Sequence, residues 1–322
     1  MANIKDIAKA AGVSATTVSN VLNGKANVGI RTRERILSIC KEMNYHPNIM
    51  AKNLKAGKTN TVMFSFSDFE REFYLRIING INDCLVSNEI GMIICSHTTT
   101  ANFLNNGFVD GAIVLDKNIT DQQIQGASGE DMKIVVMDRL LENPHVSCVV
   151  TDNEAGMQEL VTGLVKKGYQ RFCYVGGLEH TLDHAERYTV FCRVLRENQI
   201  PFTQSHYFRG DYSLNSGLRA GKIMAMGGNL PEIVVCANDE MAQGVIQSFR
   251  EFGIDVPGQV AVSGFDGDPN TKLPEGFLTT AVIPRYETGY LAAETLVAMI
   301  RQREASMVRK IKASLLWGQS TR

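Results

Sequence analysis

Residues 4–24 read IKDIAKAAGVSATTVSNVLNG, a pattern typical of two short helices joined by a tight turn. Apolar residues repeat at helical spacing over residues 4–11, and Gly12 then breaks the pattern. Ser14 is a suitable cap for the second helix, and Asn23-Gly24 ends it. These residues therefore predict a compact helical unit at the start of the chain.

A third amphipathic stretch extends this unit from Thr32 to Asn44. Two helices joined by a glycine-containing turn and followed by a supporting helix form the helix-turn-helix plan, and any small three-helix bundle is the alternative. The second helix favours DNA binding, because the outer face at its N-terminal end carries short side chains that can approach base edges. These side chains are Ala15, Thr16, Thr17, Ser19 and Asn20.

The charge distribution supports a polyanionic partner for this part of the chain. Residues 1–60 contain 10 Lys/Arg and 3 Asp/Glu, a balance of +7, whereas residues 61–322 contain 23 and 31, a balance of −8. The two values sum to the formal net charge of −1. A basic segment attached to a mildly acidic one is consistent with nucleic-acid binding, although a solvated basic face is an alternative.

Residues 4–24, together with residues 44–48 (NYHPN) and the following Ala51 and Leu54, closely resemble the opening of LacI-family transcription regulators. The resemblance implies a helix-turn-helix domain over residues 1–60, with a hinge helix at 48–54 and a short linker. It also implies that Leu54 wedges into the minor groove and that Ala15, Thr16 and Asn20 lie at the base-reading positions. Alanine can contact only a thymine methyl group or leave its base unread. The residues expected to contact DNA are Ser14, Ala15, Thr16, Thr17, Asn20, Asn23, Ala51 and Leu54.

The remainder of the chain alternates strand-sized apolar runs with amphipathic helical stretches. The predicted strands are 61–66, 92–95, 112–115, 134–137, 172–175, 233–236 and 260–262. The predicted helices are 75–86, 154–167, 185–197, 214–226 and 240–252. This alternation indicates an α/β fold with parallel sheets, and residues 61–322 are long enough for two doubly wound lobes. They resemble a periplasmic sugar-binding protein and are expected to bind an effector and to dimerise.

The family resemblance also implies an effector pocket between the lobes. The residues expected to line it are Phe73, Tyr74, Arg187, Tyr212, Asn238 and Asp266. Paired hydrogen bonds from charged and amide groups suit a polyol, and aromatic rings can cover the C–H face of a sugar. The alternatives are that the two aromatic residues only pack and that Arg187 and Asp266 pair with each other. Asp138 and Asp152 are weaker candidates, and Asp152 is expected to tether the hinge strands instead.

No catalytic site, metal or cofactor is expected. The sequence contains neither a G-x-S-x-G elbow nor a G-x-x-x-x-G-K-[ST] loop. His180 and His184 have a spacing that could bind a metal on a helix, with Asp183 between them. The resemblance instead places His180 and Asp183 in a loop at the mouth of the cleft, with the histidines facing solvent or effector.

The chain is expected to act in the cytoplasm without a membrane partner. No apolar run approaches the ~20 residues needed to cross a bilayer, and the start of the chain does not resemble a signal peptide. The seven cysteines are scattered and form no C-x-x-C pair, which indicates free thiols.

These observations predict a homodimeric repressor of a carbohydrate-utilisation operon, released from operator DNA by a sugar. One alternative is a catabolite-control-type regulator, whose DNA binding is strengthened by a protein or a phosphorylated small molecule. The C-terminal stretch 316–320 lacks an arginine before its serine, which disfavours a phosphoserine partner. A sugar-binding or sugar-processing protein without DNA function is disfavoured by the basic head.

Overall fold

The computed structural model describes residues 2–46, 58–67, 73–96, 98–302 and 304–322. The chain divides into two compact units, Met1–Thr59 and Asn60–Arg322, which we call the head and the body. The expected hinge helix at 48–54, with Ala51 and Leu54, lies outside the described residues.

The head is a helix-turn-helix unit with a third, supporting helix. Its elements are α1 (Ile4–Ala11), α2 (Ala15–Leu22) and α3 (Ile30–Glu42). Ile7, Val18 and Ile36, one from each helix, form a core in which each has 0% exposure. Gly12 ends α1 at φ 61°, a left-handed conformation that glycine adopts at little cost. Helix α3 is shifted about two residues towards the N-terminus of the predicted stretch, because Asn44 turns left-handed at φ 47°.

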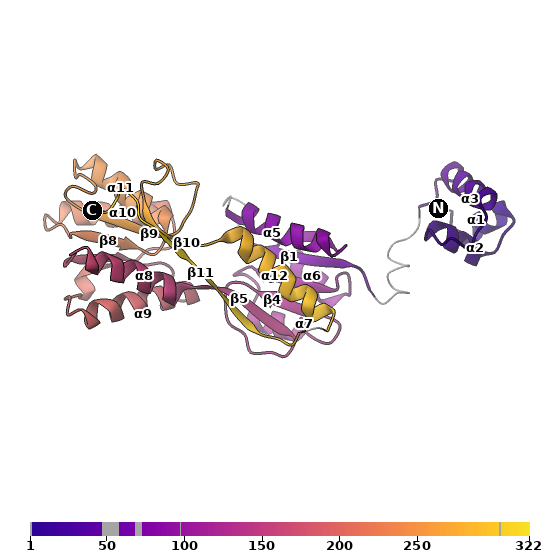
Figure 1. Ribbon diagram of the computed structural model, residues 1–322, viewed down its shortest axis with the longest axis horizontal. Helices are drawn as coiled ribbons and strands as arrows, with labels where there is room; N and C mark the ends of the chain where they lie inside the picture. Colours follow the sequence, from indigo (N-terminus) through magenta and orange to yellow (C-terminus); the bar gives the residue numbers. More distant parts are fainter. Residues whose placement is uncertain (1, 47–57, 68–72, 97, 303) are drawn as a thin grey trace. The chain divides into compact units, whose positions relative to one another are not determined.

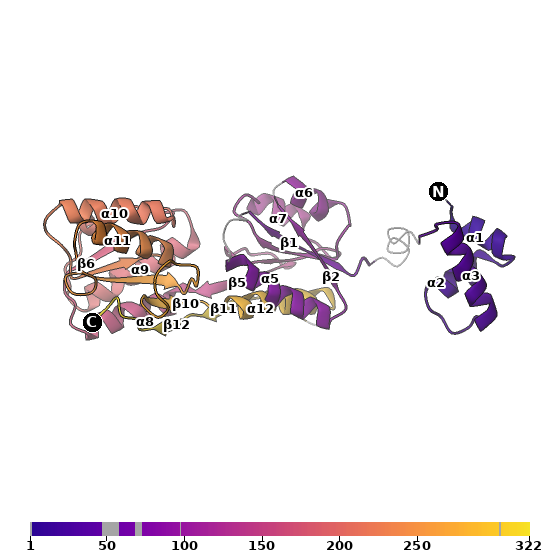
Figure 2. The ribbon, with the colours of Figure 1, turned by 90° about the horizontal axis from the view of Figure 1, so that it is seen from above.

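The first lobe of the body is a parallel sheet with strand order β11-β5-β4-β3-β1-β2. Its strands are β1 (Thr61–Phe66), β2 (Gly91–Cys95), β3 (Gly111–Leu115), β4 (Lys133–Val136), β5 (Val146–Asp152) and β11 (Val308–Lys312). Its helices are α5 (Phe73–Ser87), α6 (Thr98–Asn105), α7 (Asp121–Ala127) and α12 (Arg285–Ile300). Helices α5 and α12 cover one face of this sheet, and α6 and α7 cover the other (Figure 2). Alternate side chains of β1 point to the two faces, because Val62 and Phe64 pack with residues of α5 and α12 whereas Met63 packs with residues of α6 and α7.

Helices α5 and α12 approach each other through a pair of glycines. A Cβ atom added at Gly80 of α5 would lie 2.0 Å from the carbonyl oxygen of Tyr286. One added at Gly289 of α12 would lie 2.1 Å from the carbonyl oxygen of Ile77. Only glycine permits this backbone contact, which joins two segments about 200 residues apart in the sequence.

The second lobe has strand order β12-β10-β9-β8-β6-β7, with β12 antiparallel to β10 and the other neighbours parallel. Its strands are β6 (Phe172–Val175), β7 (Tyr207–Phe208), β8 (Ile233–Cys236), β9 (Ala261–Asp266), β10 (Thr279–Val282) and β12 (Ser314–Leu316). Its helices are α8 (Asn153–Lys166), α9 (Leu182–Glu197), α10 (Leu214–Met226) and α11 (Asp239–Glu251), and a 3-10 turn covers Gln204–His206. Helices α8 and α9 lie on one face of the sheet, and α10 and α11 lie on the other (Figure 1).

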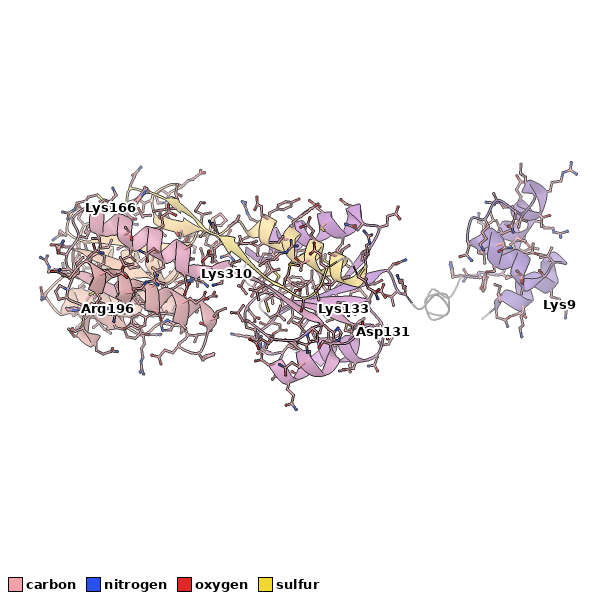
Figure 3. The ribbon with its side chains drawn as sticks, turned by 60° about the horizontal axis from the view of Figure 1, so that its bottom comes forward. Lys9, Asp131, Lys133, Lys166, Arg196 and Lys310 are labelled. Atoms are coloured by element: carbon pink, nitrogen blue, oxygen red, sulfur yellow. The ribbon has the colours of Figure 1, made fainter. Side chains whose placement is uncertain are left out.

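Within the described residues the chain crosses between the lobes three times, from β5 to α8, from β10 to α12 and from β11 to β12 (Figure 1). Figure 3 labels Lys310, on the crossing strand β11. Its ammonium group lies 3.3 Å from Glu186 Oε1 of α9, so this ion pair links the two lobes.

The predicted α/β class with two doubly wound lobes is confirmed, and the predicted strands and helices are present with small shifts of their ends. The elements named from the sequence did not include β5, β7, β10, β11 and β12 or helices α6, α7 and α12. None of the described helices is long and apolar enough to span a bilayer.

Candidate functional site

Helix α2 presents a short polar face at the N-terminal end expected to meet DNA. Thr16 is exposed and Asn20, one turn later, is half-buried, so they share an outward face. The hydroxyl of Ser14 accepts a hydrogen bond from the Thr17 amide at 3.1 Å and lies 2.9 Å from the Thr17 hydroxyl. Ser14 and Thr17 thus cap the helix, which leaves Thr16 and Asn20 as the better candidates for base contacts.

The remaining predicted DNA contacts have other local roles or lie elsewhere. Ala15 packs partly against the head core. Asn23 donates a hydrogen bond of 2.8 Å to the carbonyl oxygen of Ser19 and closes the C-terminal end of α2. Ala51 and Leu54 lie outside the described residues, so their expected roles stay predictions.

A cavity of about 250 Å³ lies between the two lobes of the body, where strands of both sheets end. It is lined by five of the six predicted residues: Tyr74, Arg187, Tyr212, Asn238 and Asp266. The side chain of the sixth, Phe73, lies outside what the structure describes. The polar lining residues that the sequence interpretation did not include in the site are Ser67, Lys117, Thr151, Thr181, Asp183, Asp211, Arg285 and Thr288, and the cavity also includes Asp138.

Arg187 of α9 is the buried anchor of this cavity, with a side chain only 3% exposed. Its Nε donates to Asn153 Oδ1 at 2.8 Å, and its Nη1 donates to the carbonyl oxygen of Ala237 at 2.6 Å. The guanidinium lies 3.9 Å from the centre of the Phe265 ring, and Nη2 is 3.2 Å from Asp266 Oδ1. These contacts fix the guanidinium in one orientation beside the cavity.

Asp266 is shared by two arginines from different lobes. Its Oδ1 faces Arg187 of the second lobe, and its Oδ2 lies 3.5 Å from Nη2 of Arg285, at the start of α12 in the first lobe. Burial raises the pKa of Asp266, and the two arginines oppose this effect. The pairing of Arg187 with Asp266 was the alternative to ligand binding, but both residues line the cavity, so the pair is itself part of the site.

Two aromatic residues border the cavity from opposite lobes. The Tyr74 ring stacks on Phe66, with centroids 4.9 Å apart. The Tyr212 hydroxyl lies 3.2 Å from Thr181 Oγ1, and burial raises the pKa of Tyr212 to about 12. Both rings are held in place by neighbours, so each presents a fixed surface to a ligand.

Asn238 and Asp152 act largely as supports. Asn238 Oδ1 accepts from the Met241 amide at 3.0 Å, and its Nδ2 donates to the Tyr212 carbonyl oxygen at 2.9 Å. Asn238 thus caps α11 and braces Tyr212, with one lone pair and one hydrogen remaining for a ligand. Asp152 ends β5 and caps α8 by accepting from the Ala155 amide at 3.1 Å, at a crossing between the lobes.

The expectation for the histidines was wrong in two respects. Helix α9 already begins at Leu182, so Asp183 lies in its first turn rather than in a loop. His184 has 6% exposure and does not line the cavity, and its Nδ1 accepts a hydrogen bond from the Gly177 amide. Of these two histidines, only His180 is exposed. The described residues contain no group of three or more His, Cys, Asp or Glu placed to hold a metal ion.

A buried carboxylate, Asp239, lies beside the site and is expected to make the stability of the body depend on pH. Burial raises the pKa of Asp239 from 3.8 to about 8, although hydrogen bonds from the Thr280 hydroxyl and the Asp268 amide favour its ionised form. Ionising Asp239 therefore destabilises the folded state. As the pH rises from about 4 to 8, the contribution of Asp239 to the free energy of unfolding should decrease by up to roughly 5 kcal/mol.

We expect Asp239→Asn to flatten this part of the pH dependence, measured by urea unfolding at pH 5 and pH 8. Asp131→Asn, at an exposed position labelled in Figure 3, is the matched control and should keep the wild-type profile. Parallel profiles for wild type and Asp239→Asn would show that Asp239 does not carry the effect.

A helix-turn-helix head on a two-lobed body with a cavity between the lobes defines a ligand-responsive DNA-binding regulator. Residues 3–48 match the model of bacterial regulatory proteins of the lacI family, and residues 161–321 match that of the periplasmic binding protein-like domain. The chain belongs to the LacI family and is a DNA-binding transcriptional regulator, not an enzyme.

Similar proteins match over nearly the whole chain. Catabolite control protein A of Priestia megaterium is 28% identical, covering 99% of each chain. The HTH-type transcriptional repressor PurR of Vibrio parahaemolyticus is 30% identical, covering 94% of this chain and 93% of the relative. Among solved structures, the lac repressor dimer bound to operator and the anti-inducer ONPF matches with a TM-score of 0.83 at 23% identity, covering 99% of each chain.

Proposed function

We propose that this protein is a homodimeric repressor of a carbohydrate-utilisation operon that leaves its operator when a sugar fills the cavity between the lobes. Residues 1–60 bind DNA, with residues 48–54 as the hinge helix, and residues 61–322 bind the effector and dimerise. The proposal places the protein in the cytoplasm, where its operator DNA is found.

The observation that carries the proposal is the composition of the cavity. Asp266, Arg187 and Asp183 offer hydrogen-bond acceptors and donors side by side, which suits the neighbouring hydroxyl groups of a polyol. Tyr74 and Tyr212 add fixed aromatic surface. Both lobes contribute to the cavity wall, so a ligand in the cavity can bind one relative arrangement of the two lobes more tightly than another. This difference in affinity is what shifts the equilibrium between the arrangements.

The test begins with an operator sequence selected from random DNA by the purified protein. Fluorescence anisotropy then follows operator binding while D-glucose, D-galactose, D-ribose or cellobiose is titrated. We expect one of these sugars to release the DNA. By linkage, saturating operator should weaken binding of that sugar by the same factor. Release without any change in sugar affinity would contradict the proposal.

Similarity to catabolite control protein A favours one alternative, in which a co-repressor strengthens DNA binding. The same titration separates the two mechanisms, because a small-molecule co-repressor tightens the complex instead of releasing it. A protein co-repressor would leave all four sugars without effect while a phosphorylated carrier protein increased the operator affinity.

Operator affinity should also depend steeply on salt. The balance of +7 over residues 1–60 provides several phosphate contacts, and each neutralised phosphate lowers the logarithm of affinity by roughly 0.9 per tenfold rise in salt. Anisotropy at 50, 100 and 200 mM KCl measures this slope. An affinity that does not change with salt would exclude the head as the phosphate-binding unit.

A further inference from the structure

The turn that joins β6 to α9, residues 176–181, forms part of the cavity wall without belonging to a helix or strand. Leu178 and Thr181 of this turn line the cavity. Thr181 Oγ1 donates to the Leu178 carbonyl oxygen at 2.7 Å and lies 3.2 Å from the Tyr212 hydroxyl. The position of the turn therefore sets the position of three lining residues.

His184, in the first turn of α9, is hydrogen-bonded to the backbone of this turn. Its buried Nδ1 accepts a hydrogen bond of 3.2 Å from the Gly177 amide, while its own amide donates to Thr181 Oγ1 at 3.3 Å. The neutral imidazole therefore carries its hydrogen on Nε2. The His184 ring stacks against Tyr188 of the same helix, with centroids 5.6 Å apart, which fixes its orientation.

The turn has no spare room between His184 and Tyr212. A Cβ atom added at Gly176 would lie 2.9 Å from His184 Cε1, and one added at Gly177 would lie 2.0 Å from the Tyr212 ring. The turn backbone is thus closely packed against both the His184 imidazole and the Tyr212 phenol. A change in the Gly177–His184 hydrogen bond should therefore shift the Tyr212 ring.

We propose that His184 is a positioning residue of the effector site, whose neutral ring fixes the 176–181 turn and whose protonation releases it and weakens effector binding. This inference rests on the proposed function of the cavity. A protonated imidazole carries hydrogen on both nitrogens and cannot accept from the Gly177 amide. The turn would then lose its link to α9 and present the Gly177 N–H to a second donor.

The groups around His184 keep it neutral near pH 7. Burial lowers the pKa of His184, Glu179 of the turn opposes this effect, and Arg187 of α9 adds to it. Glu179 is itself paired with Arg209 at 3.0 Å, and the other titratable groups that face the ring are the phenols of Tyr188 and Tyr207. Because the pKa of His184 is lowered in the folded state, this residue decreases the free energy of unfolding only when the pH falls below the ordinary pKa of 6.5.

The test measures amide exchange at Gly177 by NMR at pH 7 and at a lower pH where the His184 ring signals show protonation, in the full chain without ligand. His184→Asn is the informative variant, because its side-chain oxygen can accept from the same amide but does not titrate. We expect the Gly177 protection factor to fall at least tenfold in the wild type as the His184 ring becomes protonated, and to stay within twofold in His184→Asn over the same pH range. His180→Asn, which changes the exposed histidine next to the site, should behave as the wild type does.

Equal pH dependence in wild type and His184→Asn, or unchanged protection in the wild type, would overturn the proposal. If His184→Asn does not fold, the wild type still tests the proposal. The proposal then requires that the His184 ring signals and the Gly177 amide shift titrate with the same midpoint. Different midpoints would reject the link. This readout needs no sugar, so its failure is distinct from failure of the proposed function. Affinity for D-glucose, D-galactose, D-ribose and cellobiose at both pH values then tests the effect on binding.

Discussion

Arg187→Met is expected to abolish release of the operator by the effector sugar while operator binding itself persists. Methionine keeps much of the side-chain stem but removes the donors that hold Asn153, Ala237 and Asp266. Losing one partner of a buried, hydrogen-bonded charge pair typically costs about 2–5 kcal/mol of ligand affinity, which is at least roughly thirtyfold. Isothermal titration calorimetry and operator anisotropy measure the two effects separately.

The same substitution should lower the free energy of unfolding of the body by about 3–5 kcal/mol, because buried acceptors lose their partner. Arg187→Lys separates the site effect from the stability effect, since lysine keeps the charge but cannot reproduce the fork of donors. Arg196→Met is the matched control on the exposed end of the same helix, labelled in Figure 3, and should respond to sugar normally. A normal sugar response in both Arg187 variants would remove Arg187 from the effector site.

Ile36→Ala is expected to unfold the head and eliminate specific DNA binding while the body remains folded. Ile36 has 0% exposure in a core that also contains Ile7 and Val18. Truncating a buried isoleucine to alanine costs about 2–5 kcal/mol. At ~0.05–0.15 kcal/mol per residue, a unit of ~45 residues has only about 2–7 kcal/mol in total. Thermal unfolding followed by circular dichroism should therefore lose the helical signal of the head.

Ile30→Ala provides the control on the same helix, because Ile30 is 76% exposed and the substitution removes little buried surface. Its unfolding and operator affinity should stay close to those of the wild type. Retention of operator affinity by Ile36→Ala would mean that the head core is far more stable than its size indicates. Effector binding by the body should be the same in all three full-length proteins.

The head could be predicted from sequence because its signals are local. The Ser14 cap, Gly12 and the apolar residues at helical spacing act within a few residues of one another. The strands of the two sheets were also accessible where they are continuous buried runs, as in β6 and β8. The apolar runs of these strands are visible in the sequence without knowledge of the segments that pack against them.

Elements whose surroundings come from distant segments were missed. Helix α12 buries small and polar residues such as Thr288, Gly289 and Thr295 against α5 and the sheet, so it lacks a clear amphipathic face. Exposed residues, including Lys310 and Lys312, alternate with half-buried ones along strand β11, so the sequence shows no continuous apolar run there. The strand is recognisable only through its pairing with β5. Because α12 was missed, Arg285 at its start was missed as a cavity residue, although it follows a strand end as the predicted residues do.

The three crossings between the lobes also determine when each lobe can be completed during synthesis. The sheet of the first lobe begins at Thr61, yet it lacks α12 and β11 until Lys312 has left the ribosome. At ~5–20 residues per second, the apolar face of α5 waits on the order of tens of seconds for the helix that covers it. The head, by contrast, is complete after its first 46 or so residues. A chain whose synthesis stops before β11 therefore carries a complete head on a body whose first-lobe sheet lacks its last-made strand.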